Sequence, residues 1–385
     1  MVFTLFILIA LIVYVQAGYM AVMGLLARFF PRRVEVQATQ PMPAAISIIL
    51  CVHNGAALIA QRLRNLAACH WSGELEILLY CDGCDDDTAL RAAASNVRGL
   101  RILHGEMKRG KWAALNAGVQ AARHPILVFA DLRQTFELSA LQELAAAFQD
   151  PAVGAVSGLL EIAESAGGGG RGLDLYWRME RRLRTWEARF DSVIGCTGAI
   201  YAMRREACRA LAPGTILDDV IMPMQAAVQG WRVAYRPRAV AYDPQMLDPA
   251  KEKARKLRTL VGNYQMLESH PEWLLPWRNR LWWQLISHKY ARLLVPWCLV
   301  AVLVLTLLSP WTPLVLLLLG SQVLCYALAL LGALLPGCRS KLLTIPSGFL
   351  LLQAACASAL WAYLRCRRHP LSLWKTPQSP AQTAA

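Results

Sequence analysis

Two aspartates of this 385-residue chain come just after short apolar runs, where a carboxylate could bind a ligand. Asp131 follows the run 126–130, and Asp82 closely follows the run 76–80. Continuously apolar runs of this length are typical of strands buried on both faces. In an open α/β sheet, ligands bind outside the carboxyl ends of the strands. Both aspartates are therefore candidate ligands of a cation or a polar substrate, although each could instead cap a helix or close a turn.

A pair of adjacent carboxylates and a pair of lysines offer two further kinds of chemistry. Asp218 and Asp219 are neighbours in the sequence, and adjacent carboxylates can raise one another's pKa toward the range that suits a general base. Lys108 and Lys111 flank a glycine and could place positive charge on a phosphate group. The alternatives are an acid-rich helix N-terminus for the first pair and solvated surface lysines for the second.

These residues lie in one stretch, residues 44–243, where apolar runs alternate with helix-like segments. This alternation predicts a single α/β domain with a Rossmann-like, mostly parallel sheet. No GxGxxG pattern follows the first apolar run, 46–52, so the usual dinucleotide fingerprint is absent.

The segment 108–136 resembles the centre of the family-2 inverting glycosyltransferases, in the cellulose- and hyaluronan-synthase-like superfamily. The residues 110–118, GKWAALNAG, fit that family's GK…ALN.G pattern, and Asp131 fits the first aspartate of its DxD-type motif. Arg133 stands where the second carboxylate is usual. The resemblance covers roughly residues 44–265 and implies a GT-A domain that binds a nucleotide-sugar.

The resemblance implies a donor site at the strand ends, for which a UDP-sugar is the favoured donor. The residues placed there are His53, Asn54, Asp82, Lys108, Lys111, Asn116, Asp131 and Arg133. Asp131 would hold a divalent cation, Mg²⁺ or Mn²⁺, because such an ion needs only one or two protein carboxylates when phosphates and waters complete its shell. Arg133 could contact phosphate directly, since its guanidinium matches phosphate geometry.

The resemblance also implies an acceptor side. The segment 195–202, which includes Gly198, resembles the family's glycine-containing acceptor-side strand. The residues 215–219 hold the position of the TED segment, whose last aspartate is the general base; this role falls on Asp219, with Asp218 as its neighbour. Arg255 and Arg258 match part of a QxxRW element near the diphosphate and acceptor, although a plain basic membrane-surface helix is the alternative.

The bulk composition indicates a membrane protein. Hydrophobic residues make up 56% of the chain, the mean hydropathy is +0.34, and the formal net charge is +14. Long apolar segments with excess Lys and Arg favour a basic cytoplasmic face over nucleic-acid binding, for which no motif appears. The expected order is a transmembrane helix (1–27), a basic linker (28–43), the GT-A domain (44–243), interfacial amphipathic helices (244–291), about three transmembrane segments (292–364) and a polar tail (365–385).

This order contains a conflict. Four spans would place the basic tail on the side opposite the catalytic domain, against the positive-inside tendency, so one C-terminal segment could be re-entrant or interfacial. The function expected is an integral-membrane glycosyltransferase, in a bacterial inner membrane with a cytoplasmic catalytic domain. It would act beside membrane lipids on a lipid or glycan hydroxyl. The alternative is a catalytically inactive GT-A scaffold subunit of a glycan assembly system.

Overall fold

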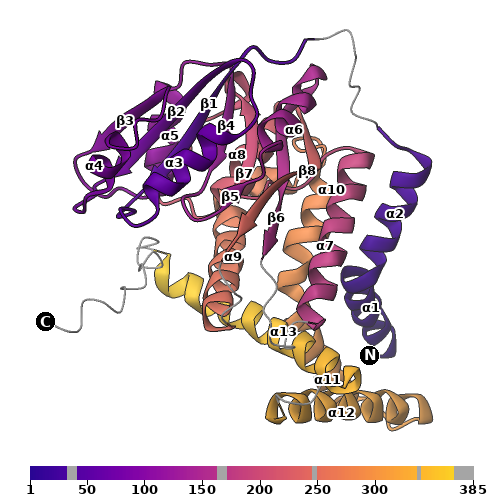
Figure 1. The fold of residues 1–385 in the computed structure, drawn as a ribbon. Helices are drawn as coiled ribbons and strands as arrows, with labels where there is room; N and C mark the ends of the chain where they lie inside the picture. Colours follow the sequence, from indigo (N-terminus) through magenta and orange to yellow (C-terminus); the bar gives the residue numbers. More distant parts are fainter. Residues whose placement is uncertain (33–40, 163–170, 245–248, 336–339, 368–385) are drawn as a thin grey trace, which may run out of the picture.

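The computed structural model describes residues 1–32, 41–162, 171–244, 249–335 and 340–367. A sheet domain and a group of long helices lie against each other (Figure 1). The sheet has eight strands in the order β3-β2-β1-β4-β7-β6-β8-β5. The strands are β1 (Ala45–Val52), β2 (Glu74–Asp82), β3 (Leu100–Gly105), β4 (Ile126–Ala130), β5 (Thr135–Phe136), β6 (Val153–Ile162), β7 (Ile200–Arg204) and β8 (Arg232–Asp243).

The first four strands of the order are parallel, as the alternating pattern predicts. Val52 lies opposite Cys81, and Leu50 lies opposite Ala130, so the carboxyl ends of β1, β2 and β4 meet at one edge. The other half is mixed, because β7 runs antiparallel to both β4 and β6. Apolar periodicity reports burial but not strand direction, so this reversal was outside what the pattern could predict.

Helices cover both faces of the sheet. Ile59, Leu63 and Leu66 of one helix are fully buried against the face that also carries Ile48. The opposite face carries Ile49, which belongs to a second core cluster. These layered helices are α3 (Ile59–Ala68), α4 (Thr88–Ala93), α5 (Lys111–Ala121), α6 (Ala140–Ala146) and α8 (Asp218–Val228).

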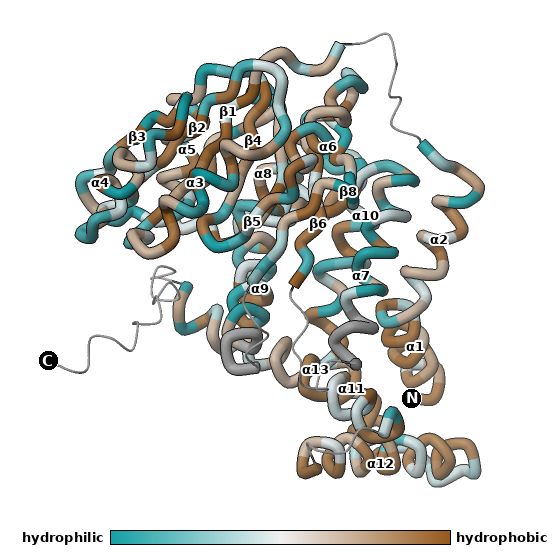
Figure 2. The backbone as a smooth tube through the Cα atoms, in the orientation of Figure 1, coloured by the Kyte–Doolittle hydropathy of each residue, from teal (hydrophilic) through white to brown (hydrophobic). Residues whose placement is uncertain are grey.

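Within the described residues, four helices are long and apolar enough to cross a membrane, in agreement with the predicted spans. They are Val2–Phe29, Trp282–Leu308, Pro313–Leu334 and Lys341–Cys366. Figure 2, a backbone tube coloured by hydropathy, shows hydrophobic residues along much of their length. The helices of this part are α1 (Val2–Val13), α2 (Tyr19–Phe29), α7 (Arg171–Phe190), α9 (Pro249–Ser269), α10 (Trp282–Leu285), α11 (Ala291–Leu308), α12 (Pro313–Leu334) and α13 (Lys341–Cys366). Residues 33–40 of the predicted linker and 368–385 of the predicted tail lie outside the described part.

The ends of two of these helices pair with acids that follow α7 and lie on α9. The guanidinium of Arg32, just after α2, lies 3.1 Å from the carboxylate of Asp191, which follows α7. At the end of α13, Arg367 pairs with Glu268 of α9. In Figure 1, α12 lies crosswise at the end far from the sheet. That the end of α13 lies on the same side of the membrane as the sheet domain stays a prediction.

Candidate functional site

Asp82 holds the loop that carries the predicted basic residues. Its carboxylate accepts hydrogen bonds from the backbone N–H groups of Arg109, at 2.9 Å, and Gly110, at 2.8 Å. Gly110 has φ +97°, a conformation that favours glycine. Asp82 is only 5% exposed, so its carboxylate shapes the entry to α5, and Lys108 lies exposed in the loop that it shapes.

The residues after β1 are bound to those after β2. The Nδ1 of His53 lies 2.9 Å from the carbonyl oxygen of Asp82. The side-chain amide of Asn54 donates to the Asp85 carboxylate and accepts from the Asp85 backbone N–H at 3.1 Å. Asn54 adopts φ +53°, which an asparagine tolerates better than most residues. The two strand ends therefore form one surface, where the sequence predicts the base-binding part of the donor site.

Lys111 forms one charged cluster with two other predicted residues, Asp131 and Asp218. Its ammonium nitrogen lies 3.1 Å from Oδ1 of Asp131 and 3.1 Å from Oδ2 of Asp218. The Asp131 side chain is 38% exposed, whereas that of Asp218 is 7% exposed. The structure thus brings together the end of β4, the start of α5 and the start of α8. In the sequence, Asp218 comes more than eighty residues after the other two.

Burial and charge set the protonation of this cluster in opposite directions. Burial raises the pKa of Asp218 to about 6, against the attraction of Lys111. Burial by itself would lower the pKa of Lys111, but the surrounding carboxylates, led by Asp131, raise it above its usual value. Lys111 therefore stays charged at neutral pH, whereas Asp218 titrates about one pH unit below neutrality.

Asp219 is held by the glycine segment that the resemblance assigns to the acceptor side. Its Oδ2 accepts a hydrogen bond from the backbone N–H of Gly198 at 3.1 Å. Its carbonyl oxygen accepts from the N–H of Cys196 at 2.7 Å. A Cβ at Gly198 would lie 3.0 Å from the same carboxylate oxygen, so a side chain there would press on Asp219. Asp219 remains partly exposed beside the buried Asp218.

Arg133 forms an ion pair with Asp243, a contact that the sequence did not indicate. Its guanidinium lies 2.6 Å from Oδ2 of Asp243, at the end of β8, and Gln134 donates to the same oxygen at 3.0 Å. Asp243 is 2% exposed. Arg133 keeps a 44% exposed side chain, so part of its guanidinium still faces solvent. Its contact with phosphate stays a prediction.

Two side-chain amides hold the loop that leads into Asp218. The amide of Asn116 exchanges two hydrogen bonds of 2.9 Å with the backbone of Leu211. The amide of Gln265, on α9, accepts from the N–H of Ile216 and donates to the carbonyl of Gly214, both at 2.9 Å. Asn116 is thus engaged in positioning the loop, and its predicted contact with the nucleotide-sugar stays a prediction.

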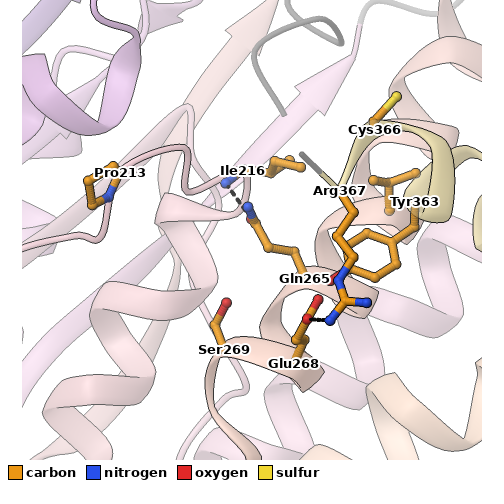
Figure 3. A pocket seen from close by; sticks show the side chains of 9 residues that line it. Pro213, Ile216, Gln265, Glu268, Ser269, Tyr363, Cys366 and Arg367 are labelled. Carbon is orange, nitrogen blue, oxygen red and sulfur yellow. Dashed lines mark hydrogen bonds and ion pairs between the residues drawn. The ribbon is translucent and has the colours of Figure 1, made fainter. Parts of the chain in front are cut away.

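A surface pocket lies beside the loop that Gln265 holds. Figure 3 shows Gln265 reaching Ile216, with the Glu268–Arg367 pair next to it. The pocket has a volume of about 370 Å³. The end of α13 forms one wall of it, so a membrane-associated helix contacts the elements that position Asp218.

Arg255 and Arg258 lie on α9, apart from the Lys111 cluster. The guanidinium of Arg255 lies 5.7 Å from the centre of the Trp177 ring on α7, a cation–π arrangement. Arg258 is exposed. Their roles toward diphosphate and acceptor stay predictions.

A divalent cation fits this site through one protein carboxylate. Among the described residues, no group of three His, Cys, Asp or Glu side chains could hold a metal ion. Asp131 is partly exposed at the strand end, and magnesium commonly binds one or two carboxylates together with substrate phosphates. Asp131 would therefore hold the ion together with the donor diphosphate.

Sequence reasoning missed Arg62, which binds the backbone of Asp131. Arg62 is 1% exposed, and its Nε donates to the backbone carbonyl of Asp131 at 3.0 Å. Burial lowers the pKa of Arg62 to about 10. A signal was present: Arg62 lies between Ile59 and Leu66 on the apolar face of its helix, where a charged residue needs a specific partner.

Comparisons with known proteins identify the family. A model of the Glycosyltransferase like family 2 matches residues 43–262. An N-acetylglucosaminyltransferase of Rhizobium leguminosarum bv. viciae is 27% identical over 219 residues, which are 53% of this chain and 51% of the relative. One of Rhizobium sp. (strain N33) is 24% identical over 248 residues, with 60% and 55% covered. The chain thus spans about half the length of the curated relatives it matches.

The fold is similar to that of a solved structure. A mannosyltransferase from Pyrobaculum calidifontis, in complex with GDP-Man and Mn²⁺, has a TM-score of 0.66 and 20% identity, covering 93% of this chain and 99% of the other. This likeness confirms the predicted GT-A architecture and includes the long helices. Because the family model spans more than half of the chain, the protein belongs to the glycosyltransferase like family 2.

Proposed function

We propose that this glycosyltransferase moves a sugar from a nucleotide-sugar to a hydroxyl of a lipid or glycan acceptor, with inversion. The observation that carries the proposal is the placement of Asp219. Its carboxylate is fixed by the Gly198 amide, partly exposed, and adjacent to the cluster of Lys111, Asp131 and Asp218. A fixed and accessible carboxylate next to the place proposed for the donor diphosphate is the arrangement that a direct displacement needs.

In this reaction Asp219 acts as the general base. It takes the proton of the acceptor hydroxyl while the hydroxyl oxygen forms a bond to the anomeric carbon. The bond between that carbon and the diphosphate oxygen breaks, and its electron pair leaves with the nucleoside diphosphate. A single displacement inverts the anomeric configuration. Asp218 ion-pairs with Lys111 and is less accessible, which favours Asp219 for this role.

The chain's own cations act on the departing diphosphate. Lys111 is held at the strand ends by two carboxylates, and Lys108 is exposed in the loop before it. A divalent cation at Asp131, when bound, would neutralise charge on the diphosphate. The backbone around Asn54 and Asp85 would receive the base, for which uracil is favoured. The catalytic domain would face the cytoplasm of a bacterium.

The test is release of nucleoside diphosphate by the purified, membrane-extracted protein. UDP-, GDP- and dTDP-sugars are offered with a crude lipid extract, with Mg²⁺, Mn²⁺ or EDTA. Replacing Asp219 by Asn is expected to lower turnover by roughly 10²–10⁴-fold. The matched control is Glu206→Gln, which removes an exposed acid from the loop before α8 and is expected to keep wild-type turnover.

Two results would contradict the proposal in different ways. Wild-type turnover by Asp219→Asn would remove Asp219 as the base while leaving the transferase intact. Donor binding without turnover of any sugar would instead favour an inactive GT-A scaffold. The sequence feature that favours this alternative is Arg133, which replaces the second DxD carboxylate. Turnover that survives EDTA would show that the lysines suffice without a cation.

A further inference from the structure

A cavity lies among the long helices. It has a volume of about 210 Å³. Its walls come from the helix 2–29, from α7 and α9, from the helix 282–308, and from α13. This volume is below the roughly 300–1,000 Å³ of pockets that enclose a drug-sized molecule. A small headgroup fits it.

Two buried amides and one ammonium of the lining have unpaired polar atoms. Asn263, on α9, and Gln353, on α13, are each 5% exposed, and the Oδ1 of the first and the Oε1 of the second have no hydrogen-bond partner. Within the described residues, the ammonium of Lys289 makes neither a hydrogen bond nor an ion pair. Buried polar atoms without partners are costly, and a cation inside a membrane-spanning segment is more so. A ligand in the cavity would supply what these groups lack.

The other charges of the cavity are already paired. Glu180 lies 3.0 Å from Nε2 of His288 and 3.5 Å from the guanidinium of Arg292. The second ring nitrogen of His288 lies 2.8 Å from Glu187, which also accepts from the hydroxyl of Tyr19. Although burial opposes it, the contact with His288 holds the pKa of Glu180 well below its usual range. The charge of Glu180 is thus paired with His288 and Arg292, and Lys289 remains as the cation that can receive an anion.

The lining also contains apolar side chains. Val15 and Met20 of the N-terminal helix, and Leu352 of α13, line the cavity. These helices belong to candidate membrane spans. A cavity that combines an ammonium, buried amides and apolar side chains between such helices suits an amphipathic molecule with an anionic head.

The cavity is also connected to the proposed base. Arg184, one turn after Glu180 on α7, donates to Oγ1 of Thr197 at 2.6 Å and to the carbonyl of Gly195 at 3.1 Å. That glycine segment holds Asp219. A headgroup held at Lys289 would therefore lie beside α7, the helix whose Arg184 holds this segment.

We propose that this cavity binds the phosphate-bearing headgroup of a membrane lipid, which serves as the acceptor, with Lys289 on the phosphate and Asn263 and Gln353 on headgroup hydroxyls. This inference rests on the proposed function and specifies its acceptor. The binding step needs no donor, so it is tested separately from sugar transfer. Phosphate on a lipid and free phosphate share the chemistry that Lys289 recognises, and the experiment distinguishes them.

The experiment measures lipid retention by the full chain in native mass spectrometry, after reconstitution in phosphatidylcholine containing phosphatidylglycerol. We expect the wild type to retain phosphatidylglycerol over phosphatidylcholine, and Lys289→Met to lose this preference by roughly tenfold or more. Lys341→Met, at the exposed start of α13, is the matched control and should retain it. Asp219→Asn should bind like the wild type, so a failed transferase and a failed lipid site give different results.

A second variant guards against misfolding. Gln353→Leu changes the cavity from α13, and it should weaken retention while donor-nucleotide binding confirms the fold. Equal retention by Lys289→Met and the wild type would overturn the site. Equal loss in Lys341→Met would reduce the effect to general surface charge and overturn it as well. Displacement of the lipid by inorganic phosphate alone would assign the cavity to free phosphate rather than to a lipid, and would refute the proposal.

Discussion

Replacing Lys111 by Met isolates the charge balance on which the site depends. The substitution keeps most of the side-chain volume but leaves Asp131 and Asp218 without the ammonium that lies 3.1 Å from each. Removing one partner of a buried ion pair costs about 3–5 kcal/mol. The Asp131 side chain is 38% exposed, so water screens its share, and we expect the low end, about 3 kcal/mol.

The sign of the pH dependence follows from Asp218. Its pKa is raised to about 6 by burial, so between its usual value and about 6 the folded state binds the additional proton, and stability rises as the pH falls. Without Lys111, the attraction that opposes this rise is gone, and the proton binds more readily still. The deficit of Lys111→Met is therefore largest near neutral pH and shrinks as the pH falls toward about 6, where Asp218 of the wild type takes up its proton as well.

Thermal unfolding of the extracted protein, followed between about pH 8 and about pH 5.5, measures this deficit. About 3 kcal/mol corresponds to a fall in Tm of roughly 6–12 °C for a domain of this size. Lys108→Met removes an exposed lysine three residues away and should leave the Tm unchanged. A deficit that stays constant over this pH range, or that Lys108→Met shares, would refute the reasoning.

Three further predictions follow from the same contacts. Gly198→Ala places a Cβ 3.0 Å from the Asp219 carboxylate and should lower kcat by roughly 10- to 100-fold with little change in donor KM; an unchanged kcat would contradict this. Asn116→Leu removes both bonds to Leu211 and should cost about 1–3 kcal/mol of stability, read as a lower Tm. A reporter fused at the C-terminus should face the same side of the membrane as the sheet domain, because Arg367 pairs with Glu268; labelling from opposite sides would show that α12 crosses.

The sequence was sufficient for the elements of the donor edge. Buried apolar runs predicted β1, β2 and β4, and the resemblance placed Lys111 and Asp131 at their ends. These two side chains do meet there, and Asp218, which the resemblance assigned to the acceptor side, joins them. The roles of all three stay predictions. Local patterns succeed in such cases because a parallel sheet brings the carboxyl ends of its strands to one edge, whatever the lengths of the connections.

The partners of these residues were not predictable in the same way. Arg133 meets Asp243 across 110 positions of sequence, because β8 enters the sheet two strands from β7 and beside β5. The carboxylate of Asp82 accepts hydrogen bonds from the backbone N–H groups of Arg109 and Gly110. No side-chain motif indicates these backbone contacts. Such contacts depend on strand order and on backbone geometry, and the periodicity of apolar residues carries neither.

The helix α7 connects the membrane part to the proposed base. On one side, its Glu187 accepts from Tyr19 of α2 at 2.6 Å and contacts His288 at 2.8 Å. On the other side, its Arg184 holds the segment whose Gly198 amide fixes Asp219. Because buried, hydrogen-bonded charges tolerate little displacement, the position of Asp219 is set relative to the membrane helices as well as to the sheet. An acceptor that approaches along those helices would therefore meet a base already placed for it, which is a physical reason for a soluble fold to be built so closely onto membrane spans.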